Sequence, residues 1–522
     1  MPAGAHIGFS HRVGYNGRMG HFNLAIDGAI VGLYLLATMA AGLMVRKYVG
    51  RVEDFLVAGR EMNVYLGVAS LAATEFGIVT CMYTAENGFR YGFAGATPGI
   101  LNALAMLAVG LTGFCIRPLR QSGVMTLPEL FERRFGPGVR RAAGVVIVLG
   151  GLLNMGMFLR TGGEFLVQVT GFSLTAAPDA AGLAVWMQAH TLELAMTALL
   201  LMVAVYTILG GMLSVLVTDY LQFIVMSVGL LAVTVLVLAR VGWERLVATV
   251  QAAHGGGGFN PFSHPQMGWP YVLFNALLNL AAVLTWMAVI QRVLSAKDAR
   301  TGQKVYTRTS FFFVARFLIP GIWGIAALAV LGPATNSLQA MPRFLGSFLP
   351  VGLMGVLVAA MLAADMSTDS SYMLTWASVI YNDIIAPFRL KNWSERRGLR
   401  WNRMIVAGIG LFLLFYGLWY PLQGDLWTYL GVTGTVYLSS MSVLLIACCY
   451  WRRASAGGAA AAIAIGALVP VLYLVLEQVP GTSAWVRGHI GPYYSGIAAY
   501  VLAAAAMVAG SLLRPARRPE KP

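Results

Sequence analysis

Charged side chains are scarce in this chain. Asp, Glu, Lys and Arg make up only 11% of its 522 residues, whereas 58% are hydrophobic. Because soluble domains carry about a quarter charged residues, this composition excludes an ordinary soluble domain. The four cysteines are scattered through apolar segments and lack the spacing of a metal site or a disulfide framework. A zinc motif, a nucleophile elbow and a phosphate-binding loop are also missing, so we expect neither enzymatic activity nor an organic cofactor.

Long apolar runs recur from one end of the chain to the other. Each holds roughly 18 to 25 residues, which is enough to cross a bilayer as a helix. The sequence therefore predicts an all-α integral membrane protein with about thirteen transmembrane helices in one domain, 1–522. The first run is too long for a signal peptide and lacks a cleavage pattern. The predicted spans are 23–45, 62–85, 94–116, 141–170, 190–209, 212–239, 270–290, 309–332, 346–385, 404–420, 426–450, 457–477 and 492–513.

The basic residues follow the predicted topology. A formal net charge of +15 could indicate nucleic-acid binding. If the N-terminus lies outside, however, 27 of the 36 Lys and Arg residues, Arg292 among them, fall in inner loops and in the tail 514–522. This is the positive-inside bias of membrane proteins. We therefore expect a multi-pass protein of the plasma membrane (the bacterial inner membrane) with an outside N-terminus, a cytoplasmic C-terminus, a lipid environment and no nucleic-acid partner.

The ninth predicted span carries a polar cluster. The sequence of 363–371 is AADMSTDSS, with four hydroxyls and two carboxylates at membrane depth. Ser367, Ser370 and Ser371 share one helix face, and the two aspartates share another. Hydroxyls can bond back to carbonyls one turn earlier, but that accounts for only one or two of these groups. Because polar groups in lipid are costly and oxygen ligands suit a small hard cation, the cluster predicts an ion site that lines a cavity.

The second predicted span contains polar residues beside a glycine. Its segment 71–83, LAATEFGIVTCMY, holds Thr74, Glu75 and Thr80 around Gly77. A local break at this glycine would release backbone carbonyls that can bind an ion. The alternative for Glu75 is a neutral, hydrogen-bonded carboxyl group, which burial favours.

Three further charged side chains lie within predicted spans. Asp219 is about two turns into its span, where simple solvation is the alternative to a function. Arg160 has Glu164 one turn later, so a structural ion pair is the alternative to anion binding. Arg316 has no acid within one turn of its own helix. Because a guanidinium matches the geometry of a carboxylate, either arginine could bind a substrate anion.

At these residues the chain resembles the sodium/solute symporter family, which includes sodium-coupled carriers of sugars, proline, pantothenate, sialic acid and monocarboxylates. The resemblance begins at FLVAGR (55–60) and extends to the last predicted span; its motifs are YTILGGMLSVLVTDYLQ, IQRVLSAKDAR and LAADMSTDSSYML. It implies a transport core of two inverted five-helix repeats with one extra N-terminal and two extra C-terminal helices. The implied segments are 23–45, the repeats 62–241 and 270–451, and the C-terminal pair 457–513.

The resemblance also implies sodium as the coupling ion. The shared sodium site of the family lies between the first and eighth core helices. Its matching positions here are Ala73, Phe76 and Ala364 through their carbonyls, and Ser367 and Thr368 through their hydroxyls. Some members have a second sodium site, and its pattern is matched by Asp219, Ser367, Ser370 and Ser371.

For the solute, the resemblance implies a pocket near the middle of the membrane. Arg316 and Asn279 align with a lysine and an asparagine that contact sugar in the sugar carriers. Ala282 stands where those carriers place a tyrosine gate, and Thr80 replaces their glutamine, which argues against a sugar. Two intramembrane arginines favour an organic anion instead. The expected solute contacts are Thr80, Asn102, Arg160, Asn279, Arg316 and Trp427.

We therefore expect a secondary active transporter that takes up a small organic solute, with a carboxylate as the candidate, together with sodium by alternating access. A proton-coupled symporter of the same fold is the first alternative, because Glu75 and Asp369 are acids at membrane depth. A solute sensor that acts with a separate signalling partner is the second. Nothing in the sequence indicates a continuous pore. The sequence predicts neither the identity of the solute nor an oligomeric state.

Overall fold

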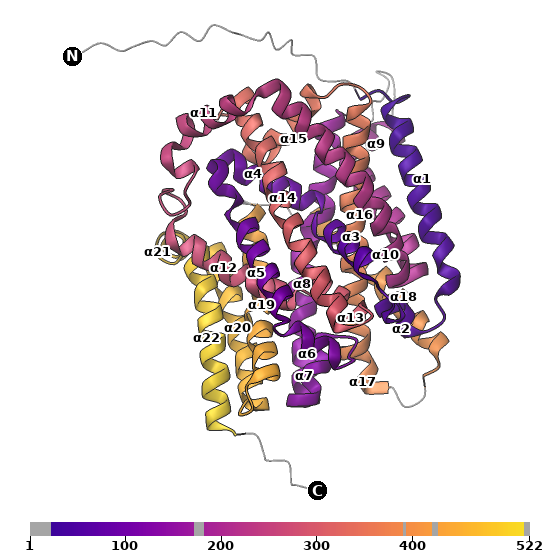
Figure 1. Ribbon diagram of the computed structural model, residues 1–522, viewed down its shortest axis with the longest axis vertical. Helices are drawn as coiled ribbons and strands as arrows, with labels where there is room; N and C mark the ends of the chain where they lie inside the picture. Colours follow the sequence, from indigo (N-terminus) through magenta and orange to yellow (C-terminus); the bar gives the residue numbers. More distant parts are fainter. Residues whose placement is uncertain (1–21, 172–181, 390–392, 420–425, 516–522) are drawn as a thin grey trace, which may run out of the picture.

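The computed structural model describes residues 22–171, 182–389, 393–419 and 426–515. Within these ranges every regular element is a helix, and most of the long helices run along the vertical axis of Figure 1. Eleven of the described helices are long and apolar enough to cross a membrane. The predicted all-α, multi-pass membrane fold is confirmed, while the number of thirteen spans and the side of the N-terminus stay predictions.

The long helices are separated by short helices and tight turns. α10 bends at Gly211, whose φ of 54° requires a glycine, so one apolar element covers two predicted spans. The unbroken long helices are α1 (Asp27–Val45), α5 (Thr97–Thr112), α8 (Pro137–Thr170), α14 (Ala299–Leu331), α16 (Leu353–Val379), α18 (Glu395–Trp419), α19 (Leu426–Tyr450), α20 (Ala456–Gln478) and α22 (Gly491–Leu513), with the bent α10 at Thr191–Val241. The short ones are α2 (Val52–Val57), α6 (Ile116–Gln121), α7 (Leu127–Phe135), α9 (Leu183–Ala189), α11 (Trp243–His254), α15 (Ser337–Phe348), α17 (Ala386–Arg389) and α21 (Ser483–His489).

Two helices are broken near their middles. The first divides into α3 (Val64–Glu75) and α4 (Ile78–Tyr91), and Phe76 between them has a non-helical ψ of 61°. The second divides into α12 (Gly268–Thr285) and α13 (Met287–Ser295) at Trp286, which has a ψ of 114°. The glycine in the second predicted span thus indicated the first break correctly. The predicted span 270–290 lies within the candidate membrane span Gly268–Ser295, but the break at Trp286 inside it was not predicted.

α16 lies at the centre of the molecule. Every residue from 357 to 379 is buried, so this helix is surrounded by protein rather than by lipid. Asp27 of α1 caps the N-terminus of α16. The Asp27 carboxylate accepts hydrogen bonds from the backbone N–H groups of Gly352 at 2.7 Å and Gly355 at 2.8 Å. A carboxylate at a helix N-terminus satisfies donors that have no partner within the helix. The polar cluster of the ninth predicted span therefore lies on the most buried of the helices that are long and apolar enough to cross a membrane.

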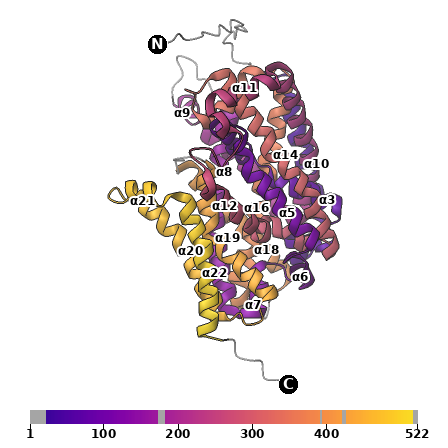
Figure 2. The same ribbon diagram turned by 60° about the vertical axis from the view of Figure 1, so that its left-hand side comes forward.

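The short helices gather at the two ends of the molecule. Figure 1 shows α2, α6, α7 and α17 at the lower end, whereas α9, α11 and α15 lie at the upper end; α20 and α22 stand side by side at the edge in both views (Figures 1 and 2). At the lower end Arg140 of α8 is buried and pairs with Asp383 at 2.8 Å and Glu132 at 2.5 Å. Several of the most basic segments of the sequence share this end, as the positive-inside pattern requires.

α4 and α14 touch through their backbones. A Cβ added at Gly324 would lie 1.9 Å from the carbonyl oxygen of Ala85, and one added at Gly88 would lie 2.2 Å from that of Gly321. Small residues allow such close approach between membrane helices. The contact fixes the relative positions of the two helices, both of which carry polar side chains toward the centre.

We expect Gly324→Ala to destabilise the protein by about 1–3 kcal/mol, because the new methyl group cannot fit against the Ala85 backbone. The measurement is the midpoint of thermal unfolding in detergent. Gly408→Ala is the matched control: this helical glycine of α18 has nothing within 4 Å of an added Cβ. Equal midpoints for the two variants would show that the α4–α14 contact is looser than described.

Candidate functional site: a broken helix, α16 and a central pocket

The break between α3 and α4 faces the hydroxyls of α16. The Thr368 hydroxyl lies 2.8 Å from the carbonyl oxygen of Thr74 and 3.0 Å from that of Ala364. A Cβ at Gly77 would come within 2.7 Å of the Thr368 hydroxyl, so the glycine leaves room for this contact. Hydroxyl and carbonyl oxygens, buried together, are the ligands that a hard monovalent cation such as sodium accepts.

The five residues matched to the first sodium site all lie in this region. Ala73 and Phe76 are completely buried and flank the end of α3, where the N–H of Phe76 donates to the carbonyl of Ala73 at 3.2 Å. Ala364, Ser367 and Thr368 follow one another along the facing turn of α16. The predicted meeting of the broken helix and α16 is thus found, while the role of each residue as a sodium ligand stays a prediction.

A second polar cluster surrounds Asp219 of α10. Ser367 donates to one of its carboxylate oxygens at 2.5 Å, and Ser70 donates to the other at 2.5 Å. The guanidinium of Arg292, from α13, forms an ion pair with the second oxygen at 3.1 Å. Both charged side chains are 0% exposed, so Asp219 is not the solvated residue that its position near a span end allowed.

Arg292 was missed by the sequence reasoning. Its placement among the inner-loop basic residues is wrong, because it is completely buried in α13. The same guanidinium nitrogen that meets Asp219 donates to the hydroxyls of Ser371 at 2.5 Å and Thr74 at 2.6 Å. The only sign in the sequence that Arg292 could be buried was its place in the motif IQRVLSAKDAR, directly after an apolar run.

Of the residues matched to a second sodium site, the structure brings Asp219, Ser367 and Ser371 to one cluster. The hydroxyl of Ser370 donates instead to the carbonyl of Ser367, 3.1 Å away on its own helix. This is the back-bonding that membrane helices commonly show. The cluster at Asp219 therefore contains the positive charge of Arg292. The hydroxyl of Ser370, which was expected there, bonds elsewhere.

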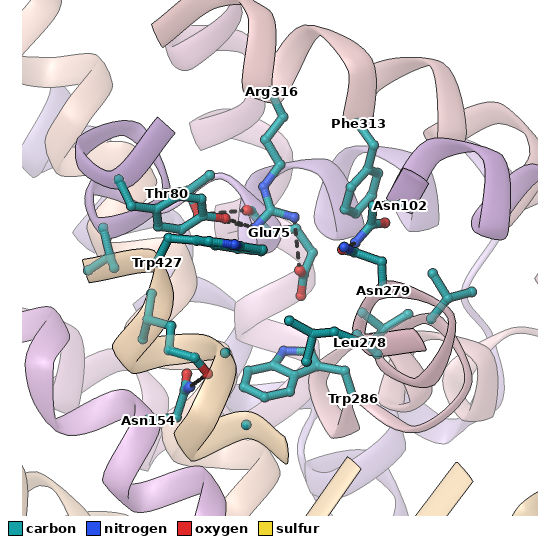
Figure 3. A pocket seen from close by; sticks show the side chains of 18 of the residues that line it. Glu75, Thr80, Asn102, Asn154, Leu278, Asn279, Trp286, Phe313, Arg316 and Trp427 are labelled. Atoms are coloured by element: carbon teal, nitrogen blue, oxygen red, sulfur yellow. Dashed lines mark hydrogen bonds and ion pairs between the residues drawn. The ribbon is translucent and has the colours of Figure 1, made fainter. Parts of the chain in front are cut away.

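A central pocket borders the break. It is lined by residues of both broken helices together with residues of α5, α8, α14, α16 and α19. Five of the expected solute contacts line it, and Figure 3 shows them around one space: Thr80, Asn102, Asn279, Arg316 and Trp427. Their contact with a solute stays a prediction. Sequence reasoning missed the aromatic lining, because aromatic residues occur throughout the apolar spans. These further lining residues include Tyr83, Phe158, Trp286, Phe313, Phe317 and Tyr372.

Arg316 is held by groups of the broken helix. It pairs with Glu75 at 3.2 Å and donates to the hydroxyls of Thr80 at 3.1 Å and Tyr83 at 3.2 Å (Figure 3). Across the pocket the Asn102 amide donates to the side-chain oxygen of Asn279 at 2.8 Å. The partner of Arg316 thus lies 241 residues away in sequence, on the first broken helix.

Three buried polar atoms of the pocket have no hydrogen-bond partner in the described part of the chain. They are Nε of Arg316, Oε1 of Glu75 and Oδ1 of Asn102. Buried polar groups are normally satisfied, so such atoms need an explanation, and a ligand is one. The lining residues of the pocket therefore include one buried donor and two buried acceptors whose hydrogen bonds the described residues do not supply.

Arg160 does not contribute to this pocket. It pairs with Glu164 at 3.1 Å, one turn along α8, and is not among the lining residues. The structural ion pair that the sequence offered as the alternative is therefore present, and a contact of Arg160 with the solute stays a prediction. Asp365 and Asp369, by contrast, are buried in α16, and each has one carboxylate oxygen without a hydrogen-bond partner among the described residues.

Two broken helices, an oxygen-lined break and a pocket beside it define the architecture of an ion-coupled secondary transporter. The sequence profile of the "Sodium:solute symporter family" matches residues 55–466. The chain therefore belongs to this family, as its motifs predicted, and the family consists of transporters rather than enzymes.

Characterised relatives cover most of the chain. It is 25% identical to "Sodium/glucose cotransporter 4" of Danio rerio, over 88% of this chain and 73% of that protein. It is 28% identical to "Sodium/glucose cotransporter" of Vibrio parahaemolyticus, over 69% and 70%. A solved structure of a Na⁺-coupled sialic acid symporter in an outward-open state shares the fold, with a TM-score of 0.77 at 17% identity over 94% of this chain and 99% of that one.

We expect Thr368→Val to weaken sodium binding roughly tenfold or more, about 1.4 kcal/mol, because it removes the hydroxyl that faces the break. Sodium affinity is measured from the increase of the unfolding temperature with sodium concentration. Thr375→Val is the matched control on the same helix, since the Thr375 hydroxyl has no hydrogen-bond partner in the described ranges. Unchanged sodium affinity in Thr368→Val would remove this residue from the ligand set.

Proposed function

We propose that this chain is a sodium-coupled symporter that takes up a small organic solute across the plasma membrane by alternating access. Membership of the sodium:solute symporter family supports coupling to sodium. The observation that carries the proposal is the contact of Thr368 with the broken helix. The residues that follow this contact along the chain, Glu75 and Thr80, line the solute pocket.

This arrangement gives the two sites a physical connection. Sodium at the break draws α3, α4 and α16 together and so fixes the side chains that receive the solute. Because coupling is reciprocal, the solute must raise sodium affinity by the same factor. Each sodium ion that moves inward contributes about 2.3 kcal/mol at a membrane potential of 100 mV. That energy can drive accumulation of a solute against its gradient.

For the solute, we propose a small organic acid that also carries an N–H or O–H donor. Nε of Arg316 has no partner among the described residues and would donate to a carboxylate oxygen of the solute. Oε1 of Glu75 and Oδ1 of Asn102 also have no partner there and would accept from its N–H or O–H groups. The Glu75–Arg316 pair balances its own charge, which disfavours a plain monocarboxylate. The relatives named for glucose would also need acceptors for O–H groups. The ion pair in the pocket of this chain, however, favours a charged or zwitterionic solute.

Proton coupling is the second candidate. Asp365 and Asp369 lie one turn apart in the buried α16, without a basic partner described for either. A carboxyl group in that environment can carry a proton across the membrane. The two functions differ in the gradient that drives uptake, which an experiment can impose.

In proteoliposomes with a sodium gradient, we expect solute accumulation that disappears when sodium is replaced by choline. The membrane potential should increase the uptake of a zwitterionic solute, because the coupling ion then supplies the net charge that moves inward. The control imposes a pH gradient at equal sodium on both sides. Accumulation driven by the pH gradient alone would assign the chain to proton coupling and overturn the sodium proposal.

We expect Glu75→Gln to shift solute preference toward plain monocarboxylates by roughly tenfold relative to amino or hydroxy acids, because Arg316 then keeps an unbalanced charge. The measurement is competition for binding among acids matched in size. Glu164→Gln is the matched control, since Glu164 pairs with an arginine that does not line the pocket. If the unmodified protein, Glu75→Gln and Glu164→Gln all show the same order of preference among these acids, Glu75 does not determine which solute is bound.

A further inference from the structure

The carboxylate of Asp219 already has a cation beside it. Arg292 Nη2 lies 3.1 Å from Oδ2, and both side chains are 0% exposed. They come from different elements, α10 and α13, and α3 and α16 contribute the hydroxyls that surround them. The same cluster is the one whose pattern matches a second sodium site.

Each oxygen that a sodium ion would need at this place is already bonded. Oδ1 of Asp219 accepts from Ser367, and Oδ2 accepts from Ser70 and Arg292. The hydroxyls of Thr74 and Ser371 both accept from Arg292 Nη2 and lie 2.9 Å from each other. The guanidinium thus lies at the point where the carboxylate and the two hydroxyls converge.

The guanidinium is also fixed at its other nitrogens. Nε donates to the hydroxyl of Ser70 at 3.1 Å, and Nη1 donates to the carbonyl of Ala288 at 3.1 Å, one turn earlier in α13. Arginine keeps its positive charge at all accessible pH values. A sodium ion at the same oxygens would face this charge at close range in a buried site, which opposes its binding.

We propose that Arg292 is a tethered cation that takes the place of a second sodium ion at Asp219, so that the protein binds and transports one sodium ion for each solute. The residues at this cluster do not fit a second sodium ion, whereas those at the Thr368 break fit the first. The inference rests on the proposed sodium-coupled function and specifies its stoichiometry.

The first test counts sodium ions on the unmodified protein. Binding of radiolabelled sodium to the purified, detergent-solubilised chain should saturate at one ion per chain, and solute uptake should depend on sodium with a Hill coefficient of one. Two ions per chain would overturn the inference while leaving sodium coupling intact. No sodium binding at all would overturn both the inference and the proposed function.

The second test removes the tethered charge. Arg292→Gln should raise the count to two ions per chain, because Asp219 is then free to bind sodium. Arg292→Lys keeps a positive charge and should keep the count at one. Arg140→Gln is the matched control, since it also removes a buried arginine from an aspartate pair, at the lower end of the molecule. A folded Arg292→Gln protein that still binds one sodium ion would overturn the inference, and if this variant does not fold, the count on the unmodified protein decides.

Discussion

A helix that breaks inside a membrane is stable only if neighbouring protein groups satisfy the backbone that the break exposes. In this protein α16 meets that need, because the Thr368 hydroxyl lies at the carbonyl of Thr74. The glycine at the break is what permits the approach, since a side chain at Gly77 would occupy the same space. The requirement for a partner accounts for the position of Thr368 on α16, the most buried of the helices long and apolar enough to cross a membrane.

The same constraint governs charge. Four arginines of the spans and their ends each have an acid within 3.2 Å; they are Arg140, Arg160, Arg292 and Arg316. Isolated charges at membrane depth are costly, and pairing reduces the cost. At Asp219 hydroxyls surround the ion pair completely, so the pair stabilises the fold. At Arg316 the ion pair lies beside an open pocket and some of its polar atoms have no partner, so the pair can take part in binding a solute.

Sequence reasoning succeeded where local pattern determines structure. The apolar runs gave the all-α membrane fold, the glycine in the second span gave the first break, and the spacing of Arg160 and Glu164 gave their ion pair. It failed where structure depends on distant parts of the chain. The partner of Arg316 is 241 residues away, and the break at Trp286 lies in an apolar segment without glycine or proline. Arg292 stood just after an apolar run, where a buried arginine and a loop arginine have the same local sequence.

The backbone contact between α4 and α14 has a consequence for transport in both directions. Thr80 and Tyr83 belong to α4 and Arg316 belongs to α14, so the three side chains would stay together if the two helices move as one body during transport. Rearrangements that admit solute from one side or the other must then occur elsewhere along the lining. A solute leaving the cytoplasm and one arriving from outside therefore encounter the same set of polar groups, so competing molecules should rank in the same order during influx and efflux.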